Sequence, residues 1–344
     1  MKTKKRGLLV FQFSTLANSA MSVPILRALF DAQPDLEITW VTQSDAVPLF
    51  NEFDKIKLIE VDLNGTHQGW KGMYRLFQEL RQASRYRAIV DLQGSQTTIF
   101  LGVLFQAIGY RLVRVNWGYR EKARLIRSKN KILKPLTHTV FRFAAVFQKL
   151  GFTVPLEGLE IPPKPIYNQA NIPNEDPPKK WIGAAPFATN KTNTYPLNQM
   201  QQVIAFLQQS HKVYLFGITP EEIEQFRVWE KAYPNVVNVS EKMSFEEQLN
   251  LIPHLDLMLS MDSQFAHFAA NWKVPVLTIW GQTHPYAGFA PFGQSIANAI
   301  LPDLKQFPSL PRSVDGNKKG VQMGAIFKSI TPKLILEKAL KLMG

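Results

Sequence analysis

One run in the last third of the chain carries side chains whose types and spacing suit the binding of an anion. Asp262 and Ser263 follow an apolar stretch at the position where a helix N-cap belongs, and His267 comes about one helical turn later. Thr283 and His284 follow a second apolar stretch. The unpaired N–H groups of a helix N-terminus, together with nearby hydroxyl groups, form a ready site for phosphate. The residue types therefore predict a phosphate-containing ligand.

Two buried strands and the turns after them must position these side chains. The apolar runs Leu255–Leu259 and Val274–Trp280 have the length of buried strands. Between them, Phe265 and Phe268 lie at helical spacing, which predicts a short helix. In an open parallel sheet both turns lie at the carboxyl ends of the strands, where ligands bind. We therefore expect the two turns to hold one pyrophosphate group jointly.

The rest of the chain alternates strand-like and helix-like segments in two series. Such alternation predicts βαβ units and parallel sheets. No Gly-x-Gly-x-x-Gly follows the first strand, so a dinucleotide site is not indicated. The predicted strands are Gly7–Phe13, Glu37–Thr42, Lys57–Val61, Ala88–Leu92, Trp181–Phe187, Lys212–Phe216 and Val236–Val239. The predicted helices are Met21–Phe30, Trp70–Ala83, Thr97–Ile108, Leu197–Gln208, Pro220–Tyr233, Phe245–Ile252 and Pro332–Met343.

A proline-rich stretch separates the two series. Several prolines between positions 162 and 178 rule out a helix or a central strand there. At 344 residues the chain has room for two domains of ordinary size. We expect an α/β protein with an amino-terminal domain over residues 1–163, a linker over 164–178, a second domain over 179–330, and a last helix within 331–344 that crosses back to the first domain.

The composition indicates a globular chain with an anionic partner. Hydrophobic residues make up 45% of the chain and charged residues 19%, which is typical of a folded protein. Cysteine is absent, so disulfides, thiolate metal sites and a cysteine nucleophile are excluded. The formal net charge of +13 favours nucleic acid, a membrane surface or a phosphorylated glycolipid as the partner. The carboxylates and histidines lack a convincing metal-ligand pattern, so no metal is expected.

The positive charge is concentrated in one segment. Between Arg111 and Lys134, basic residues recur and are interleaved with Trp117 and Tyr119. This pattern fits single-stranded nucleic acid, an anionic bilayer or simply a solvated face. No recognised nucleic-acid motif accompanies it, so nucleic acid is not the expected partner. The apolar run Leu8–Phe13 is too short for a signal peptide or a membrane span, which predicts an unexported, cytoplasmic protein.

The run that opens this section resembles glycosyltransferase family 9, the heptosyltransferases of lipopolysaccharide core assembly. That family carries Asp-(Ser/Thr)-x-x-x-His, then a Pro-led strand, then Gly-x-Thr-x-Pro. The resemblance implies the architecture called GT-B, in which two Rossmann-like parallel-sheet domains face each other across a cleft. It also implies an inverting transferase without a cofactor, acting on a nucleotide sugar, for which ADP-heptose is expected, and on an anionic glycolipid acceptor. Such a protein is expected to make peripheral contact with the cytoplasmic face of the inner membrane. The matching positions are Asp262, Ser263, His267, Gly281, Thr283 and Pro285.

The resemblance extends to three more segments of the second domain. Residues 185–191 are similar to the family's diphosphate loop, where Thr189 is the expected phosphate donor group. The turn from Gly217 to Glu221 is similar to one whose acidic residue faces the nucleoside. Met243 stands where the family places a methionine in the base pocket, although ordinary core packing is the better explanation for a lone methionine.

Two departures from the family pattern bear on the mechanism. Asn18 stands where the family has the aspartate that acts as general base, and an amide does not accept a proton at neutral pH. Asn193 stands where the family often has a lysine in the phosphate loop, and Lys191 is the expected substitute. Asp91, at the end of a first-domain strand, is the candidate for the missing base. The alternative for Asp91 is a structural carboxylate bonded to the backbone.

Four hypotheses about function follow from the sequence. The leading one is an inverting glycosyltransferase that moves a sugar, expected to be a heptose, onto a lipid-linked acceptor. The second is a catalytically impaired relative that binds a nucleotide sugar and serves as a scaffold in glycan assembly, which the amide at Asn18 favours. A basic nucleic-acid binder and a nucleotide-sugar epimerase of the same architecture remain as further alternatives.

Overall fold

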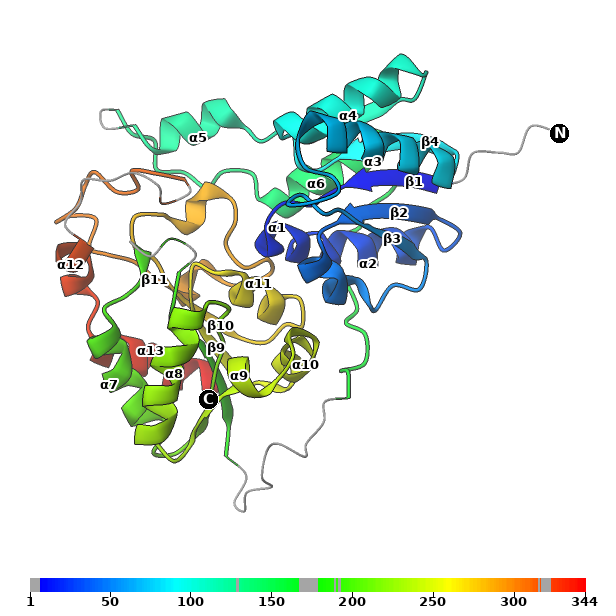
Figure 1. The fold of residues 1–344 in the computed structure, drawn as a ribbon. Coiled ribbons are helices and arrows are strands. Elements are labelled where there is room, and N and C mark those ends of the chain that lie inside the picture. Colours follow the sequence, from blue (N-terminus) through cyan, green and yellow to red (C-terminus); the bar gives the residue numbers. More distant parts are fainter. Residues whose placement is uncertain are drawn as a thin grey trace. The chain divides into compact units, whose positions relative to one another are not determined.

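The structure is a computed structural model that describes residues 7–127, 130–166, 179–188, 190, 193–314, 316 and 323–344. The chain divides into two compact units, which Figure 1 draws as ribbons. The first unit comprises Met1–Trp117 and Thr139–Glu160, and the second comprises Gly118–His138 and Ile161–Gly344.

The first unit is built on a five-stranded parallel sheet with the strand order β3-β2-β1-β4-β5. Starting from β1 in the middle, the chain adds β2 and β3 on one side and then β4 and β5 on the other. The direction in which strands are added therefore reverses between β1 and β4. The strands are β1 (Gly7–Phe11), β2 (Glu37–Thr42), β3 (Ile56–Glu60), β4 (Tyr86–Asp91) and β5 (Leu112–Arg114).

Helices cover this sheet and complete its core. The apolar faces of α3 and α4 pack on Leu9, Phe11 and Ile89 of the central strands. Helix α4 begins with a capping box between Ser95 and Thr98, which satisfies the first free N–H groups of the helix. The helices are α1 (Leu16–Ala20), α2 (Val23–Ala32), the 3-10 helix η1 (Ser44–Phe50), α3 (Gly69–Ala83), α4 (Gln96–Ala107) and α6 (Thr139–Gln148).

The second unit is built on a six-stranded parallel sheet with the order β11-β10-β9-β6-β7-β8. Its order reverses between β6 and β9, so both sheets have the strand order of a doubly wound fold. The predicted α/β class with two parallel sheets is confirmed. The strands are β6 (Trp181–Ala185), β7 (Lys212–Leu215), β8 (Val236–Asn238), β9 (Leu257–Met261), β10 (Val276–Ile279) and β11 (Ala299–Ile300).

Alternate strand residues of this sheet point into one core, as the two-residue period of a strand requires. Leu257, Leu259 and Met261 of β9 pack there with side chains of α7, α8 and α13. Helices α8 and α10 each begin with a capping box. The helices are α5 (Tyr119–Leu125), α7 (Leu197–Leu207), α8 (Pro220–Ala232), α9 (Val239–Lys242), α10 (Phe245–Leu251), α11 (Gln264–Ala270), α12 (Met323–Ile326) and α13 (Pro332–Met343).

The segment Gly118–His138 lies in the second unit, whereas the sequence suggested a single amino-terminal domain over residues 1–163. The reason is local packing. Leu125 is fully buried with Ala287 and Val314, and the backbone N–H of Leu136 donates to the carbonyl of Tyr286. This segment therefore covers the turn that follows β10.

The last helix packs within the second unit. The bounds of α13 are those that the sequence predicts, Pro332–Met343. Its buried residues Ile335 and Ala339 belong to the core of the second unit, and α13 packs on α7 and β9. The apolar face of α13 is therefore buried within its own unit, and the expected crossing of this helix to the first domain stays a prediction. Among the described residues, no helix has both the length and the hydrophobicity required to cross a bilayer.

Candidate functional site

The polar residues of the second unit gather at the carboxyl ends of β6, β9 and β10. Ala185 of β6 pairs with Ser260 of β9, and Met261 of β9 pairs with Ile279 of β10. The segments that follow these strands therefore leave the sheet at one edge. The reversal between β6 and β9 is where doubly wound sheets bind their ligands.

The turns after β9 and β10 are in direct contact. The hydroxyl of Thr283 donates a hydrogen bond of 3.0 Å to Oδ2 of Asp262. Thr283 is almost fully buried, with 2% of its surface exposed, while Asp262 is half-buried. The proximity of the two turns, on which the predicted pyrophosphate site depends, is therefore present in the structure.

Asn193 joins the loop after β6 to the same place. Its side-chain Oδ1 accepts a hydrogen bond of 3.1 Å from the backbone N–H of Gln282. Gly281 and Gly316 leave room for the side chain of Asn193. A Cβ on Gly281 would lie 3.2 Å from its Oδ1, and a Cβ on Gly316 would lie 2.1 Å from its Nδ2. Asn193 thus fixes the turn after β10, and its correspondence to a lysine of the family stays a prediction.

Ser263 is the N-cap of α11, as the sequence predicts, but its side chain does not cap the helix. Instead its hydroxyl oxygen lies 3.1 Å from the hydroxyl oxygen of Ser260, which donates to the carbonyl of Met261. The hydroxyl groups at this edge therefore hold the end of β9 in place.

Two histidines beside these turns are kept neutral by burial. Burial, with a smaller contribution from nearby His138, lowers the pKa of His267 to about 3. Burial and the charge of Lys131 lower the pKa of His284 to about 4. The ring Nδ1 of His284 accepts the backbone N–H of Tyr286 at 3.1 Å. At neutral pH both imidazoles are therefore uncharged, and neither neutralises a bound diphosphate through a positive charge.

The second unit should lose stability in mild acid because of His267. An unfolded imidazole has a pKa of about 6.5, so below that pH the unfolded chain binds a proton that the folded chain refuses. The free energy of unfolding should fall by about 1.4 kcal/mol per pH unit between about pH 6 and pH 4 for each such imidazole. Urea unfolding at several pH values, compared between the wild type and His267→Leu, measures this slope. Equal slopes in the two proteins would contradict the neutral, buried state of His267.

The turn after β7 requires glycine. The backbone N–H of Gly217 donates to the hydroxyl of Ser240 at 2.7 Å. A Cβ at this position would lie 2.7 Å from the ring of Phe226 and 2.8 Å from a carboxylate oxygen of Glu222. The same oxygen of Glu222 accepts the backbone N–H of Ile218 at 2.7 Å. The turn is thus closed tightly against the start of α8.

Glu221 and Met243 lie in different settings. Glu221 is exposed and lines a hollow of about 480 Å³ together with Glu224 and Val228 of α8. Met243 is buried between α9 and α10, and its carbonyl accepts the side-chain amide of Gln248 at 3.2 Å. The assignment of these two residues to a nucleoside pocket stays a prediction. Thr189 and Lys191, predicted to contact phosphate, lie outside the described residues.

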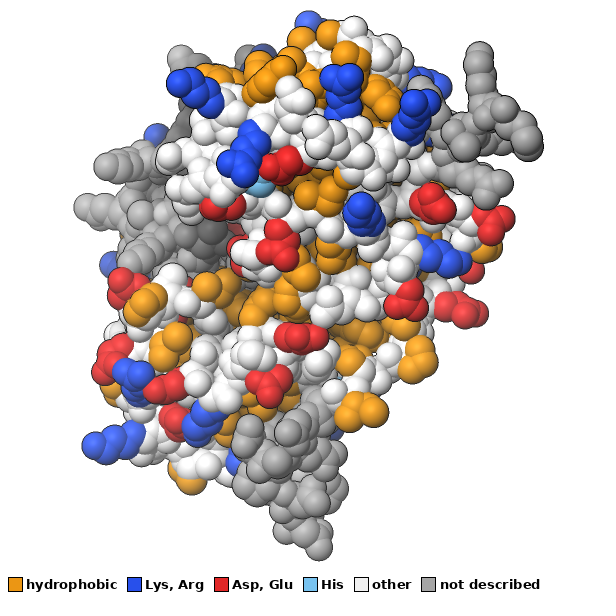
Figure 2. Space-filling model, turned by 45° about the vertical axis from the view of Figure 1, so that its right-hand side comes forward, with side chains coloured by type: hydrophobic (Ala, Val, Ile, Leu, Met, Phe, Trp, Pro, Cys, Tyr) orange, Lys and Arg blue, Asp and Glu red, His pale blue; other side chains and the backbone are white. Residues whose placement is uncertain are grey.

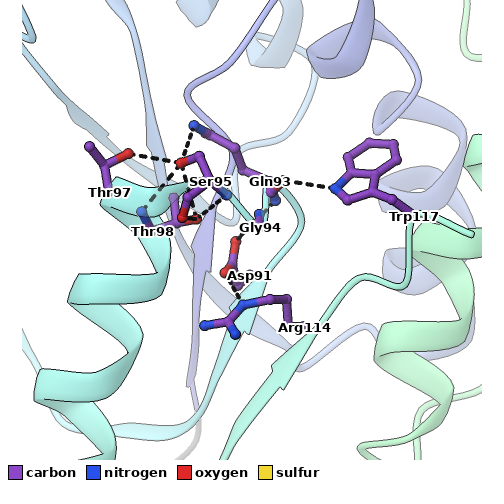
Figure 3. Close-up of polar contacts among 8 residues, drawn as sticks. All are labelled: Asp91, Gln93, Gly94, Ser95, Thr97, Thr98, Arg114 and Trp117. Atoms are coloured by element: carbon purple, nitrogen blue, oxygen red, sulfur yellow. Dashed lines mark hydrogen bonds and ion pairs between the residues drawn. The ribbon is translucent and has the colours of Figure 1, made fainter. Parts of the chain in front are cut away.

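In the first unit, Asp91 is engaged on both carboxylate oxygens (Figure 3). One oxygen accepts the backbone N–H groups of Gln93 and Gly94 at 3.0 and 2.7 Å. The other oxygen pairs with Nε of Arg114 at 2.6 Å, and Asp91 is fully buried. A general base needs a free oxygen that the substrate hydroxyl reaches. Asp91 is therefore better described as a structural carboxylate, which corrects its assignment as the substitute base.

Gln93 ties the turn after β4 to the turn after β1. Its side-chain oxygen accepts the backbone N–H of Phe13 at 3.1 Å, and its amide donates to the hydroxyl of Ser95 at 2.9 Å. The indole N–H of Trp117 donates to the carbonyl of Gln93 at 2.8 Å (Figure 3). The reversal point of the first sheet is therefore lined by neutral amide and hydroxyl groups.

Asn18 lies in α1, directly after this edge of the sheet. Its side-chain amide donates to the hydroxyl of Ser14 at 3.1 Å, and Ser14 donates to the side-chain oxygen of Gln12 at 2.6 Å. Gln12 is completely buried. Asn18 thus belongs to a chain of neutral hydrogen bonds, and its place in catalysis stays a prediction.

One carboxylate at this edge is absent from the sequence-based assignments. Asp45 is exposed in the first turn of η1, which follows β2 and packs beside α1. The side chain of Gln43 donates to the carbonyls of Phe13 and Ser14 at 2.9 and 3.0 Å, which joins the turns after β2 and β1. The signal that points to Asp45 is its place just after the predicted strand Glu37–Thr42. The family pattern directs attention to the turn after the first strand instead.

The chain is similar to known glycosyltransferases in sequence. A family model for glycosyltransferase family 9 (heptosyltransferase) matches residues 73–314, which is more than half of the chain. Lipopolysaccharide heptosyltransferase 3 of Escherichia coli (strain K12) is 23% identical over 323 residues, covering 87% of this chain and 89% of that protein.

Solved structures show the same fold. The glycosyl transferase family 9 structure from Veillonella parvula DSM 2008 matches with a TM-score of 0.73 at 18% identity, covering 100% of this chain and 98% of that one. E. coli heptosyltransferase WaaC with ADP-2-deoxy-2-fluoro heptose matches with a TM-score of 0.67 at 17% identity. The match covers 97% of this chain and 99% of the WaaC chain. The expected GT-B fold class is confirmed by these matches.

Proposed function

Because the chain belongs to glycosyltransferase family 9, we propose that it transfers a heptose from ADP-heptose to an anionic glycolipid of the lipopolysaccharide core type. The single observation that carries the donor half of this proposal is the contact between Asp262 and Thr283. It brings the two turns that resemble the family's motifs to one edge of the second sheet. The E. coli relative described above was solved with an ADP-heptose analogue, which supports a donor of this class.

The proposed reaction is a direct displacement at the anomeric carbon. The acceptor hydroxyl oxygen forms a bond to that carbon, the bond to the diphosphate oxygen breaks, and ADP departs with both bonding electrons. The acceptor proton passes to a base, and the configuration at the anomeric carbon inverts. Backbone N–H groups and hydroxyl groups at the diphosphate stabilise the charge that develops on the leaving group. We assign this part to the backbone N–H groups of the turns after β9 and β10, which the hydrogen bond from Thr283 to Asp262 holds together.

We assign the proton acceptor to Asp45 of the first unit. Asn18 carries no carboxylate, and both oxygens of Asp91 already accept hydrogen bonds. Asp45 is exposed and lies at the carboxyl edge of the sheet, beside α1. It therefore offers a carboxylate at the edge where the family's base is expected, although it follows the neighbouring strand.

A second candidate function rests on Asn18. If the amide at this position ends catalysis, the chain binds a nucleotide sugar without turning it over and acts as a scaffold in glycan assembly. Both functions share the donor site, and only the first consumes the donor.

The donor site is tested by calorimetric titration with ADP. Thr283→Val removes the hydroxyl that joins the two turns, a hydrogen bond to a carboxylate that contributes about 1.5–3 kcal/mol to holding them together. We expect ADP affinity to fall about tenfold or more, because the turns are then no longer held in place around the diphosphate. The matched control is Thr66→Val, at an exposed threonine of the first unit, which should bind ADP like the wild type. Equal ADP affinity in Thr283→Val and the wild type would place the diphosphate elsewhere.

A further inference from the structure

The outer face of α3 and α4 in the first unit exposes large apolar side chains. Trp70 and Tyr74 of α3 are 56% and 49% exposed, and Ile99 and Val103 of α4 are 39% and 54% exposed. We call these four residues the α3–α4 face. In Figure 2, hydrophobic side chains gather at the top of the view, over these helices, with Lys and Arg side chains beside them.

The α3–α4 face is continuous across the two helices. The ring of Trp70 meets the ring of Phe100 edge-on, with 5.2 Å between ring centres. Phe100 is half-buried on α4, and α3 packs directly on α4. The exposed side chains of the two helices therefore form one surface rather than scattered single residues, and such contiguous apolar surfaces mark interaction sites.

Helix α4 is apolar on both sides. Its inner residues Leu101 and Phe105 are fully buried in the core, while Ile99 and Val103 face outward. The helix contains no charged residue from Gln96 to Ala107. A surface helix normally carries charged or polar residues on its outer face. The outward residues of α4 therefore fit an apolar surrounding better than water.

The surroundings of this face are positively charged. Helix α3 carries three basic residues, Lys71, Arg75 and Arg81, against one acidic residue, Glu79, and α4 carries no charge. Glu79 is already paired, with Arg75 at 3.1 Å and His67 at 3.0 Å. Lys71 and Arg81 of α3 are exposed. The face is thus apolar at its centre and basic around it.

An apolar centre with basic residues around it favours some binding partners of the α3–α4 face over others. A second copy of the chain, docked through the same face, would bring two basic surfaces together and repel. An anionic bilayer attracts Lys and Arg while accepting aliphatic side chains into its acyl boundary. Trp and Tyr are enriched at the level of lipid headgroups, where their rings are half-solvated. Charge and residue types therefore agree on a membrane surface.

We propose that the α3–α4 face docks the first unit on the surface of an anionic phospholipid bilayer. Trp70, Tyr74, Ile99 and Val103 enter the headgroup and upper acyl region, and the surrounding Lys and Arg side chains contact lipid phosphates. This docking goes beyond the proposed reaction and is independent of it, because it requires neither donor nor acceptor. It would also hold the enzyme where a lipid-linked acceptor is anchored.

Vesicle flotation with the full chain tests this docking. The probes are vesicles of phosphatidylcholine alone and vesicles of phosphatidylcholine mixed with phosphatidylglycerol. We expect binding to the mixed vesicles that weakens as salt is added, and little binding to the neutral ones. The double variant Trp70→Ser with Val103→Ser should bind the mixed vesicles at least about tenfold more weakly, given about 1.5–3 kcal/mol for burying one large apolar side chain.

The second unit offers a matched control. Val228 on α8 is 54% exposed, the same fraction as Val103, so Val228→Ser should bind vesicles like the wild type. Circular dichroism verifies that the variants are folded.

Equal binding by the double variant and the wild type, or no preference for anionic lipid, would overturn the proposal. A second result would also overturn the proposal: the wild type is a dimer that does not bind vesicles, and the double variant is a monomer. The occupant of the α3–α4 face would then be a second copy of the chain. ADP titration of the wild type and of the double variant does not depend on vesicle binding, so failure of docking is distinguishable from failure of the proposed function.

Discussion

Replacing Asp91 with alanine is expected to lower the free energy of unfolding of the first unit by about 3–5 kcal/mol, the usual cost of removing one partner from a buried ion pair. The carboxylate is fully buried and accepts three hydrogen bonds, two from backbone N–H groups and one from Arg114. In Figure 3 these contacts converge on the turn between β4 and α4. Without the carboxylate, two backbone N–H groups and one guanidinium lose their acceptor.

Urea unfolding of Asp91→Ala, followed by circular dichroism, measures this loss. The matched control is Asp54→Ala, which removes an exposed carboxylate at the opposite, amino-terminal end of β3 and should change the unfolding free energy by less than about 0.5 kcal/mol. Arg114→Met should also destabilise, because it leaves the carboxylate buried without its ion pair. A loss below about 1 kcal/mol in Asp91→Ala would show that the carboxylate is solvated, and would reopen its assignment as a base.

Replacing Asp45 with asparagine is expected to lower the turnover of ADP-heptose by about 10²- to 10⁴-fold, the range typical of a lost general base. The affinity for ADP should stay at the wild-type value, because the proposed contacts to the diphosphate come from the turns after β9 and β10 and do not include Asp45. The measurement is release of ADP with a lipid-linked acceptor, combined with calorimetric titration of ADP.

Asp54→Asn is the control for this effect as well, since it changes an exposed carboxylate of the same unit at the other edge of the sheet. Asn18→Asp, which restores the family's carboxylate, should raise turnover in the Asp45→Asn background. Wild-type turnover in Asp45→Asn would exclude Asp45 as the proton acceptor. A parallel loss of ADP affinity would instead indicate a structural effect.

The secondary structure could be predicted from the sequence where local signals are strong. Pro332–Met343 agrees with its prediction at both ends, because Thr331 caps the helix and Pro332 opens it. The apolar runs that became β9 and β10 were recognised, with ends shifted by a few residues. The strand β5 has only three residues inside a basic and aromatic stretch, so its local pattern is too short to be recognised.

Contacts between residues far apart in the chain could not be predicted from the sequence. The assignment of Gly118–His138 to the second unit depends on Leu125 meeting Ala287 and Val314, which are far away in the chain. Asp91 meets Arg114 across 23 positions, and Asn193 meets the backbone of Gln282 across 89. The sequence places Asp91 at the end of a strand, as the structure has it. Only the three-dimensional contacts show that Asp91 is occupied and that Asn193 fixes a turn.

The most direct test of the proposed function is acceptor-dependent release of ADP from ADP-heptose by the wild-type chain. We expect release that requires the lipid-linked acceptor, with an inverted anomeric configuration in the product. Binding of ADP in calorimetry without any release, or release that appears only in Asn18→Asp, would contradict a catalytic role for the native chain and leave a nucleotide-sugar-binding scaffold.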